Sequence, residues 1–99
     1  MSLTFEWDEV KAATNLKKHS IDFEEAQSVF ADTSACIFDD EWHSSNREHR
    51  ELIIGHSLNS RLLLVCFTER EVKTIRIISA RPANKKEIKE YENNNPFRR

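Results

Sequence analysis

Two arginines and a serine in residues 72–81 have the side chains best suited to bind a phosphate. Arg76, Ser79 and Arg81 lie within the run VKTIRIISAR, which is rich in β-branched residues and is followed by a proline. Such a run predicts a β-strand. A guanidinium group is a planar fork of donors that matches phosphate oxygens, and a strand holds it rigidly. The sequence therefore predicts a phosphate site on this strand.

The spacing of the two arginines leaves their arrangement open. Side chains alternate between the two faces of a regular strand, so Arg76 and Arg81, five residues apart, are expected on opposite faces. Either Arg81 lies beyond the end of the strand, where the alternation stops, or a single arginine belongs to the site.

Other residues are candidates for supporting roles, and each has a purely structural alternative. His19 could transfer a proton, as histidine side chains commonly do, or it could cap the end of a helix. The hydroxyls of Thr68 and Ser79 could hold a phosphate or a ribose, or satisfy backbone groups. Tyr91 is expected to be half-buried, with its hydroxyl at the edge of the site. Arg70 and Lys85 are further candidates for phosphate contacts.

A metal centre is the competing interpretation. Hard and borderline metal ligands are concentrated between residues 39 and 49, namely Asp39, Asp40, Glu41, His43 and His49. Their spacing matches no rigid ligand pattern, and no second anchored histidine pair accompanies them. A solvated acidic loop, free to meet a basic partner, is the plainer interpretation. We expect no metal and no cofactor.

Charge is divided unevenly along the chain. Residues 1–72 carry seven Lys and Arg against 14 Asp and Glu, whereas residues 73–99 carry eight against three. A basic end on an acidic body can bind a polyanion with one face. Lys85, Lys86 and Lys89 are therefore candidates for RNA or other polyanion contacts, although lysines also commonly solvate a terminal helix.

Length and composition indicate one small cytoplasmic domain. The 99 residues suffice for a single core, and no apolar run approaches the roughly 20 residues of a membrane span. No signal peptide pattern is present at the N-terminus. Cys36 and Cys66 each lie in an apolar run, which is typical of reduced, buried thiols rather than a disulfide framework.

Hydrophobic spacing predicts an α+β fold. A first strand at residues 4–7 precedes a helix over 8–18, with Val10, Ala13 and Leu16 at helical spacing, and a second helix begins after Asp22. Strands follow at 35–38, 52–56, 62–67 and 72–81, with a turn at 68–71. Successive hairpins predict an antiparallel meander. A capping box of Asn84 and Glu87 starts a short last helix, and residues 93–99 are expected to form a frayed tail.

The chain resembles the BrnT family of bacterial toxins over nearly its whole length. The resemblance rests on Phe5 to Asp8, Asn15 to His19, Phe23 to Ala26, Phe67 to Arg70 and, most distinctively, Arg76 to Arg81. It departs from the family at Ser20, where glycine is common, and at Pro82, where a basic residue is common. The second departure removes one potential phosphate contact.

The resemblance implies a RelE-like fold and a toxin that cleaves RNA and halts translation. It also implies a BrnA-type antitoxin that binds the toxin, and we expect a complex of two toxins and two antitoxins. Cleavage of RNA without a metal uses the neighbouring 2′-hydroxyl as the nucleophile, so the protein must move protons and stabilise charge on the phosphate. Arg76 and Arg81 are our candidates for the charge, and His19 for the proton. The non-enzymatic alternative is a module that binds nucleic acid without cutting it.

Overall fold

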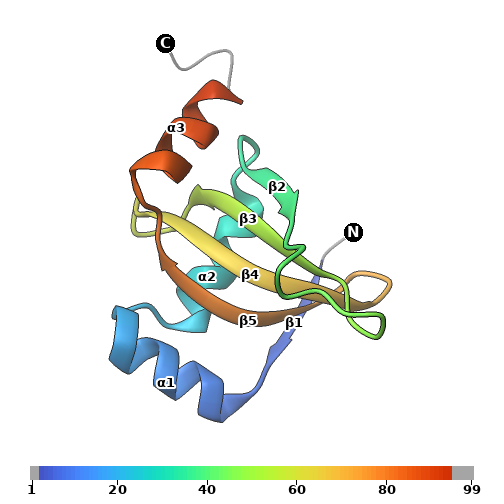
Figure 1. Ribbon diagram of the computed structural model, residues 1–99. Helices are drawn as coiled ribbons and strands as arrows, with labels where there is room; N and C mark the ends of the chain where they lie inside the picture. Colours follow the sequence, from blue (N-terminus) through green and yellow to red (C-terminus); the bar gives the residue numbers. More distant parts are fainter. Residues whose placement is uncertain (1–2, 95–99) are drawn as a thin grey trace.

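A mixed five-stranded sheet organises the chain. The computed structural model describes residues 3–94. Its elements are β1 (Thr4–Trp7), α1 (Glu9–His19), α2 (Phe23–Ser28), the 3₁₀ turn η1 (Val29–Ala31), β2 (Cys36–Asp39), β3 (Arg50–His56), β4 (Leu62–Glu71), β5 (Thr74–Pro82) and α3 (Lys85–Asn93) (Figure 1). The strand order is β1-β5-β4-β3-β2. Strands β2 to β5 form the predicted antiparallel meander, and the α+β class is confirmed. β1 pairs with β5 in parallel, so the sheet is mixed.

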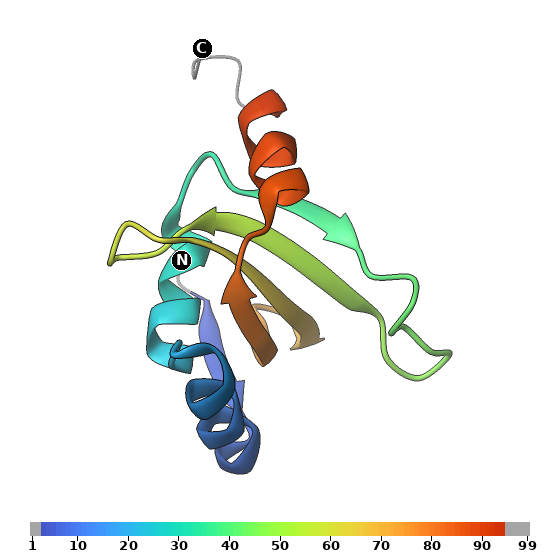
Figure 2. The ribbon, with the colours of Figure 1, turned by 60° about the vertical axis from the view of Figure 1, so that its left-hand side comes forward.

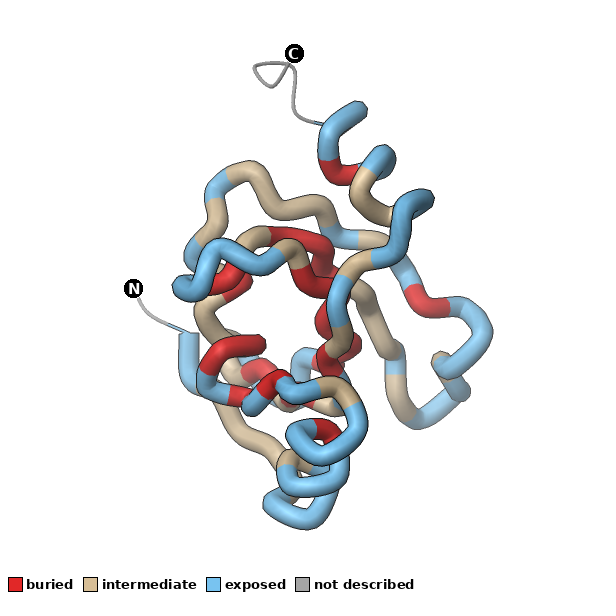
Figure 3. The backbone as a smooth tube through the Cα atoms, turned by 90° about the vertical axis from the view of Figure 1, so that its left-hand side faces the viewer, coloured by how far each residue is buried: buried red, intermediate tan, exposed pale blue. Residues whose placement is uncertain are grey.

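The main core lies between one face of the sheet and the helices α1 and α2. Leu63, Val65 and Phe67 of β4 pack there against Phe23 and Val29. The alternation of these residues along β4 is what gives the strand one apolar face. Figure 2 shows both helices on the same side of the sheet, and Figure 3 shows the buried residues gathered along the central strands and α2. No helix among residues 3–94 is long and apolar enough to cross a membrane.

Helix α1 is where predicted, but its buried face is not the predicted one. Val10 and Leu16 are 75% and 50% exposed, and Ala13 is also exposed. Ala12 and the amide of Asn15 face the sheet instead. The reason is that α1 packs along the edge of β5 beyond the end of β1, where backbone groups need a polar partner.

Helix α3 covers a smaller apolar cluster on the opposite face of the sheet. Its Tyr91 packs with Ile54 and Leu64, and the capping box of Asn84 and Glu87 is present. Tyr91 is 2% exposed, so the expectation that it would be half-buried is wrong. α3 ends at Asn93 and is capped by Asn94; the rest of the expected tail, residues 95–99, lies outside the described residues.

One predicted turn is displaced. Residues 68–71 continue β4 rather than forming a turn, because Thr68 and Glu69 still pair with β5. The chain reverses at Val72 and Lys73, and Lys73 has a φ of 68°. Ser20, which replaces a glycine common in the family, ends α1 with a φ of 59°. The left-handed conformation explains why glycine suits that position.

Candidate functional site

A β-bulge in β5 places both arginines on the same face of the sheet. Cys66 pairs with Ser79 and Phe67 with Ile77, so Ile78 has no partner of its own on β4. Ile75, Ile77 and Ala80 therefore all face the main core. Arg76 and Arg81 point to the opposite, open face. Arg81 lies within β5, so it is not beyond the end of the strand as the first alternative supposed.

Asn15 of α1 fixes the backbone just after the bulge. Its amide nitrogen donates to the carbonyls of Ala80 and Ile21, each at 2.9 Å, and its oxygen accepts from Ala80 N–H at 3.0 Å. The side chain thus replaces the missing β1 neighbour at this point of β5. Because Asn15 is buried, these bonds hold Ser79 and Arg81 in register with the rest of the sheet.

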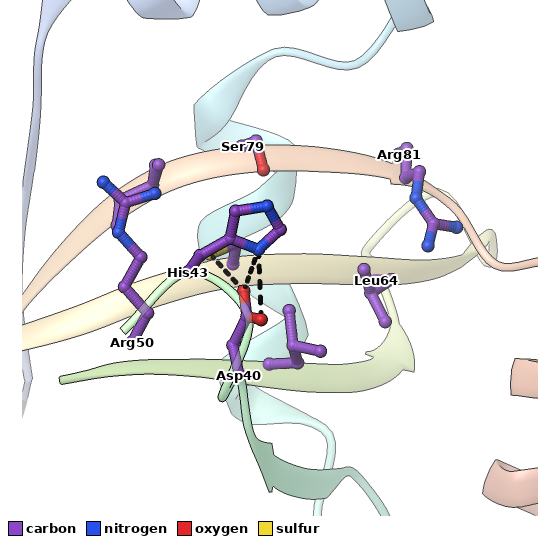
Figure 4. A pocket seen from close by; sticks show the side chains of 9 residues that line it. Asp40, His43, Arg50, Leu64, Ser79 and Arg81 are labelled. Atoms are coloured by element: carbon purple, nitrogen blue, oxygen red, sulfur yellow. Dashed lines mark hydrogen bonds and ion pairs between the residues drawn. The ribbon is translucent and has the colours of Figure 1, made fainter. Parts of the chain in front are cut away.

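The open face carries a hollow of about 240 Å³ that contains part of the predicted site. It is lined from β3, β4, β5 and the loop after β2, by Asp40, His43, Arg50, Leu52, Leu64, Cys66, Ile78, Ser79 and Arg81. In Figure 4 the His43 ring lies between Arg50 and Arg81, and Ser79 stands on β5 beside it. Two cations, a hydroxyl and an imidazole therefore surround one concave surface.

His43 is held by a buried carboxylate. His43 Nδ1 lies 2.9 and 3.1 Å from the two oxygens of Asp40, which is 5% exposed, whereas the His43 side chain is 67% exposed. The thiol of Cys66 lies 3.7 Å from Asp40 Oδ2, and burial raises the pKa of this thiol to about 11. The thiol is therefore neutral at ordinary pH. This arrangement orients the ring and leaves Nε2 toward solvent.

Each arginine of the hollow is oriented by a carboxylate. Arg50 Nε donates to Glu48 at 2.7 Å, and both terminal nitrogens of Arg81 donate to Glu87. These hydrogen bonds to the Glu87 carboxylate raise the pKa of Arg81. The side chains remain 27% and 39% exposed, so both guanidinium groups can still reach a ligand.

The other predicted phosphate-binding residues do not line this hollow. Arg76 donates to Glu6 of the neighbouring β1 at 3.1 Å, and Arg70 is exposed at the end of β4. Thr68 is buried and its hydroxyl donates to the carbonyl of His49, which favours its structural role. Lys85, Lys86 and Lys89 are exposed on α3. The Tyr91 hydroxyl donates to Asp32 at 2.8 Å and also lies beside His56.

His19 lies in a second hollow beside the first. This hollow lies between α1 and β5 and is lined by Val10, Lys11, Thr14, Asn15, Lys18, His19, Ile78 and Ser79. Ile78 and Ser79 line both hollows. Ser79 therefore stands at their shared rim, with His43 in one hollow and His19 in the other.

Comparison with known proteins identifies the family. The family model described as "Ribonuclease toxin, BrnT, of type II toxin-antitoxin system" matches residues 7–87. The chain belongs to the BrnT family. It is similar to the crystal structure of the Brucella abortus ribonuclease toxin BrnT, with 26% sequence identity and a TM-score of 0.63 over 85% of this chain and 100% of that one. No curated protein sequence matches the chain. Members of the family are ribonuclease toxins of type II systems, in which an antitoxin is the partner.

The acidic loop of this BrnT chain divides into two groups rather than forming one metal centre. Asp40 and His43 belong to the hollow, whereas Asp39, His49 and Glu51 have donor atoms within 4.8 Å of one another elsewhere. Among the described residues this second group has the donors best placed for a cation. Asp39 and His49 are exposed and bonded to each other at 3.1 Å. The carboxylates and imidazole suit a borderline divalent cation, but exposed groups of this kind are common without one.

Three residues of the BrnT hollow were missed by the sequence analysis as catalytic or phosphate-binding candidates: Asp40, His43 and Arg50. The signal was available in the spacing of Asp40 and His43, because residues three apart can meet across a turn, as they do here. Arg50 carried no such signal. It reaches the hollow because β3 is longer than its apolar run and begins at that residue.

Proposed function

We propose that this BrnT chain is an endoribonuclease that cleaves RNA by attack of the 2′-hydroxyl on the adjacent phosphorus, without a metal ion. The observation that carries the proposal is the pair formed by buried Asp40 and exposed His43, set between Arg50 and Arg81. These residues cover the two requirements of the reaction, which are proton transfer and stabilisation of the phosphate charge.

His43 takes the proton from the 2′-hydroxyl through Nε2. Asp40 holds Nδ1–H, so the other ring nitrogen is the free acceptor, and the carboxylate stabilises the imidazolium that forms. O2′ bonds to phosphorus, the P–O5′ bond breaks, and O5′ takes up a proton. The products are a 2′,3′-cyclic phosphate and a 5′-hydroxyl.

Arg81 and Arg50 stabilise the charge on the non-bridging oxygens, and the Ser79 hydroxyl donates to one of them. Guanidinium groups held by carboxylates need little reorganisation as charge develops. Arg76 and Arg70, on the open face outside the hollow, bind the phosphates of neighbouring nucleotides, with Lys85, Lys86 and Lys89 adding weaker attraction.

His19 is our candidate for the proton donor to O5′. It lines the hollow on the other side of Ser79, where Lys11 and Lys18 provide a basic path for the strand. A phosphate at Ser79 would have one histidine on each side, which suits an in-line displacement with a base and an acid on opposite sides of phosphorus.

Membership of the family supports a proposal for the cellular role. We propose that cleavage of cytoplasmic RNA inhibits translation and that a BrnA-type antitoxin covers the hollow. Two toxins and two antitoxins form the complex if the antitoxin dimerises through its DNA-binding part. Support comes from the family description, which places the chain in a type II system. Size-exclusion chromatography with light scattering tests the stoichiometry.

Incubation of the purified protein with a plain RNA in EDTA tests the activity. We expect cleavage that leaves a 2′,3′-cyclic phosphate and persists with the chelator. RNA in which every 2′-hydroxyl is methylated should stay intact, because the nucleophile is blocked. An RNA that survives unless a divalent cation is supplied would contradict the metal-free reaction, and binding without cleavage would favour a non-catalytic module.

A further inference from the structure

A tryptophan stands in solvent directly beside the proposed catalytic histidine. Trp42 is 95% exposed, whereas the other tryptophan, Trp7, packs edge-to-face on Phe23 with ring centroids 5.8 Å apart. Tryptophan is highly buried on average, because it carries a large apolar surface. An indole this exposed has both ring faces free to stack on a ligand.

The backbone under Trp42 is held in a fixed position. His43 N–H and Ser44 N–H both donate to the carbonyl of Asp40, at 3.3 and 3.0 Å, which places Trp42 at the apex of this turn. The Ser44 hydroxyl donates to the same carbonyl at 2.7 Å and accepts from Arg50 N–H at 2.9 Å. Trp42 therefore lies in a braced turn whose Asp40 and His43 side chains line the hollow, and its Cα is about 3.8 Å from that of His43.

We propose that Trp42 is a nucleobase-stacking subsite for the nucleotide next to the cleaved phosphate. This inference rests on the proposed function, because it takes the phosphate to lie between His43 and Arg81. In this proposal, a base that adjoins the phosphate stacks on Trp42, the residue that precedes His43 in the turn. Every base has a π-face, so an exposed indole binds it with little dependence on sequence. The ligand class is single-stranded RNA with an unpaired base at this position.

Binding of a short single-stranded 2′-O-methyl RNA, which cannot be cleaved at its blocked 2′-positions, tests the subsite. Stacking on one base predicts that Trp42→Leu weakens binding by about 5- to 150-fold and that Trp42→Phe, which keeps a ring, weakens it less. The indole fluorescence of the wild type should be quenched on binding. Leu58→Ala is the matched control, because Leu58 is 84% exposed and does not line the hollow, and it should leave the affinity unchanged.

A second probe identifies what Trp42 contacts. In a series of oligonucleotides that each lack one base, removal of the stacked base should weaken binding to the wild type. The same removal should not weaken binding to Trp42→Leu, which has already lost this contact. Cleavage of unmodified RNA by Trp42→Leu should show a raised KM with a nearly unchanged kcat, since stacking acts on binding.

The possible results separate this inference from the activity. If wild type and Trp42→Leu cleave RNA and bind the methylated strand equally well, the subsite is wrong and the ribonuclease assignment stands. Loss of antitoxin binding in Trp42→Leu with unchanged affinity for the oligonucleotide would also overturn it in favour of a protein contact. A wild type that neither binds nor cleaves RNA removes both proposals.

Discussion

Arg81 of β5 and Glu87 of α3 are joined by two parallel N–H···O bonds of 2.8 and 2.7 Å. The same carboxylate accepts from the backbone N–H of Asn84 at 2.9 Å, so one side chain caps α3 and orients the arginine. Burial alone would raise the pKa of Glu87, but the bonds from Arg81 and Asn84 lower it overall. Glu87 is therefore ionised at neutral pH and also neutralises part of the charge that a phosphate would meet.

Glu87→Gln should change the two kinetic constants in the same direction for different reasons. Glutamine can still cap Asn84, because the capping box accepts either residue. Loss of the negative charge should lower the KM for RNA, since Arg81 then attracts phosphate more strongly. Loss of the fixed fork should lower kcat, by about tenfold, because Arg81 is no longer preorganised.

Steady-state cleavage at two salt concentrations checks this expectation. Glu90→Gln is the matched control, since it removes the same charge from an exposed position of α3 and should change KM only slightly. An unchanged kcat in Glu87→Gln would show that Arg81 does not depend on its partner.

Arg81→Lys should be nearly as damaging as Arg81→Ala, with kcat about 10²- to 10³-fold below wild type. Lysine keeps the charge but lacks the planar fork that meets two oxygens. Arg76→Ala and Lys89→Ala lie outside the hollow and should mainly raise KM, in a way that high salt masks. Equal losses of kcat at Arg76 and Arg81 would instead place both arginines at the reacting phosphate.

Local sequence patterns predicted most of the helices and strands, and the errors have physical causes. Asp22, Asn84 and Glu87 predicted the starts of α2 and α3, and the structure confirms both. The buried face predicted for α1 was wrong because the residue that contacts β5 is Asn15, which is polar. Apolar spacing does not show where an unpaired backbone group of a neighbouring strand needs a hydrogen-bond partner. The bulge at Ile78 depends on how β4 and β5 pair across the sheet, so the sequence of residues 76–81 alone does not predict it.

The sequence predicted the chemistry of the candidate site, a phosphate-binding surface, but only some of the residues that form it. Ser79 and Arg81 were identified because phosphate chemistry favours their side chains. His43 was grouped with the possible metal ligands, since its bond to buried Asp40 forms only when the loop closes over the sheet. Arg50 is 31 residues from Arg81 in sequence, and the sheet register alone brings the two to one hollow.

Asn15→Ala should destabilise the protein by about 2–3 kcal/mol, because it leaves the Ala80 N–H and two carbonyls without their partner in a buried place. Cleavage should fall further than the loss of folded protein explains, since β5 can then shift at the bulge. Urea unfolding and kinetics on the folded fraction measure the two effects. Thr14→Ala, at an exposed neighbouring position of α1, should leave the free energy of unfolding within about 0.5 kcal/mol.

Glu25 should make stability fall at acid pH. Hydrogen bonds from Arg61 hold the pKa of this buried carboxyl below its ordinary value of 4.5, and Ser57 adds a bond of 2.7 Å. The folded state thus favours ionised Glu25, so its contribution is present above the ordinary pKa and is lost as pH falls through the lowered value. Glu25→Gln should cost about 1–3 kcal/mol at pH 7, and the difference from wild type should shrink toward pH 3.

Denaturant titrations between pH 3 and pH 7 check the Glu25 prediction. Glu24→Gln is the control, because it removes a carboxylate from the exposed side of the same helix. A difference between wild type and Glu25→Gln that stays constant with pH would show that the ion pair is not its source.

The most direct test of the central claim is single-turnover cleavage of a plain RNA in EDTA by wild type, His43→Ala and Asp40→Asn, with folding checked by circular dichroism. If His43 moves the proton and Asp40 holds its ring, His43→Ala should lose about 10²- to 10⁴-fold in rate. Asp40→Asn should lose roughly 10- to 100-fold and alter the pH dependence of cleavage near neutrality. A folded His43→Ala variant that cleaves RNA at the wild-type rate would contradict the claim and remove His43 from the chemistry.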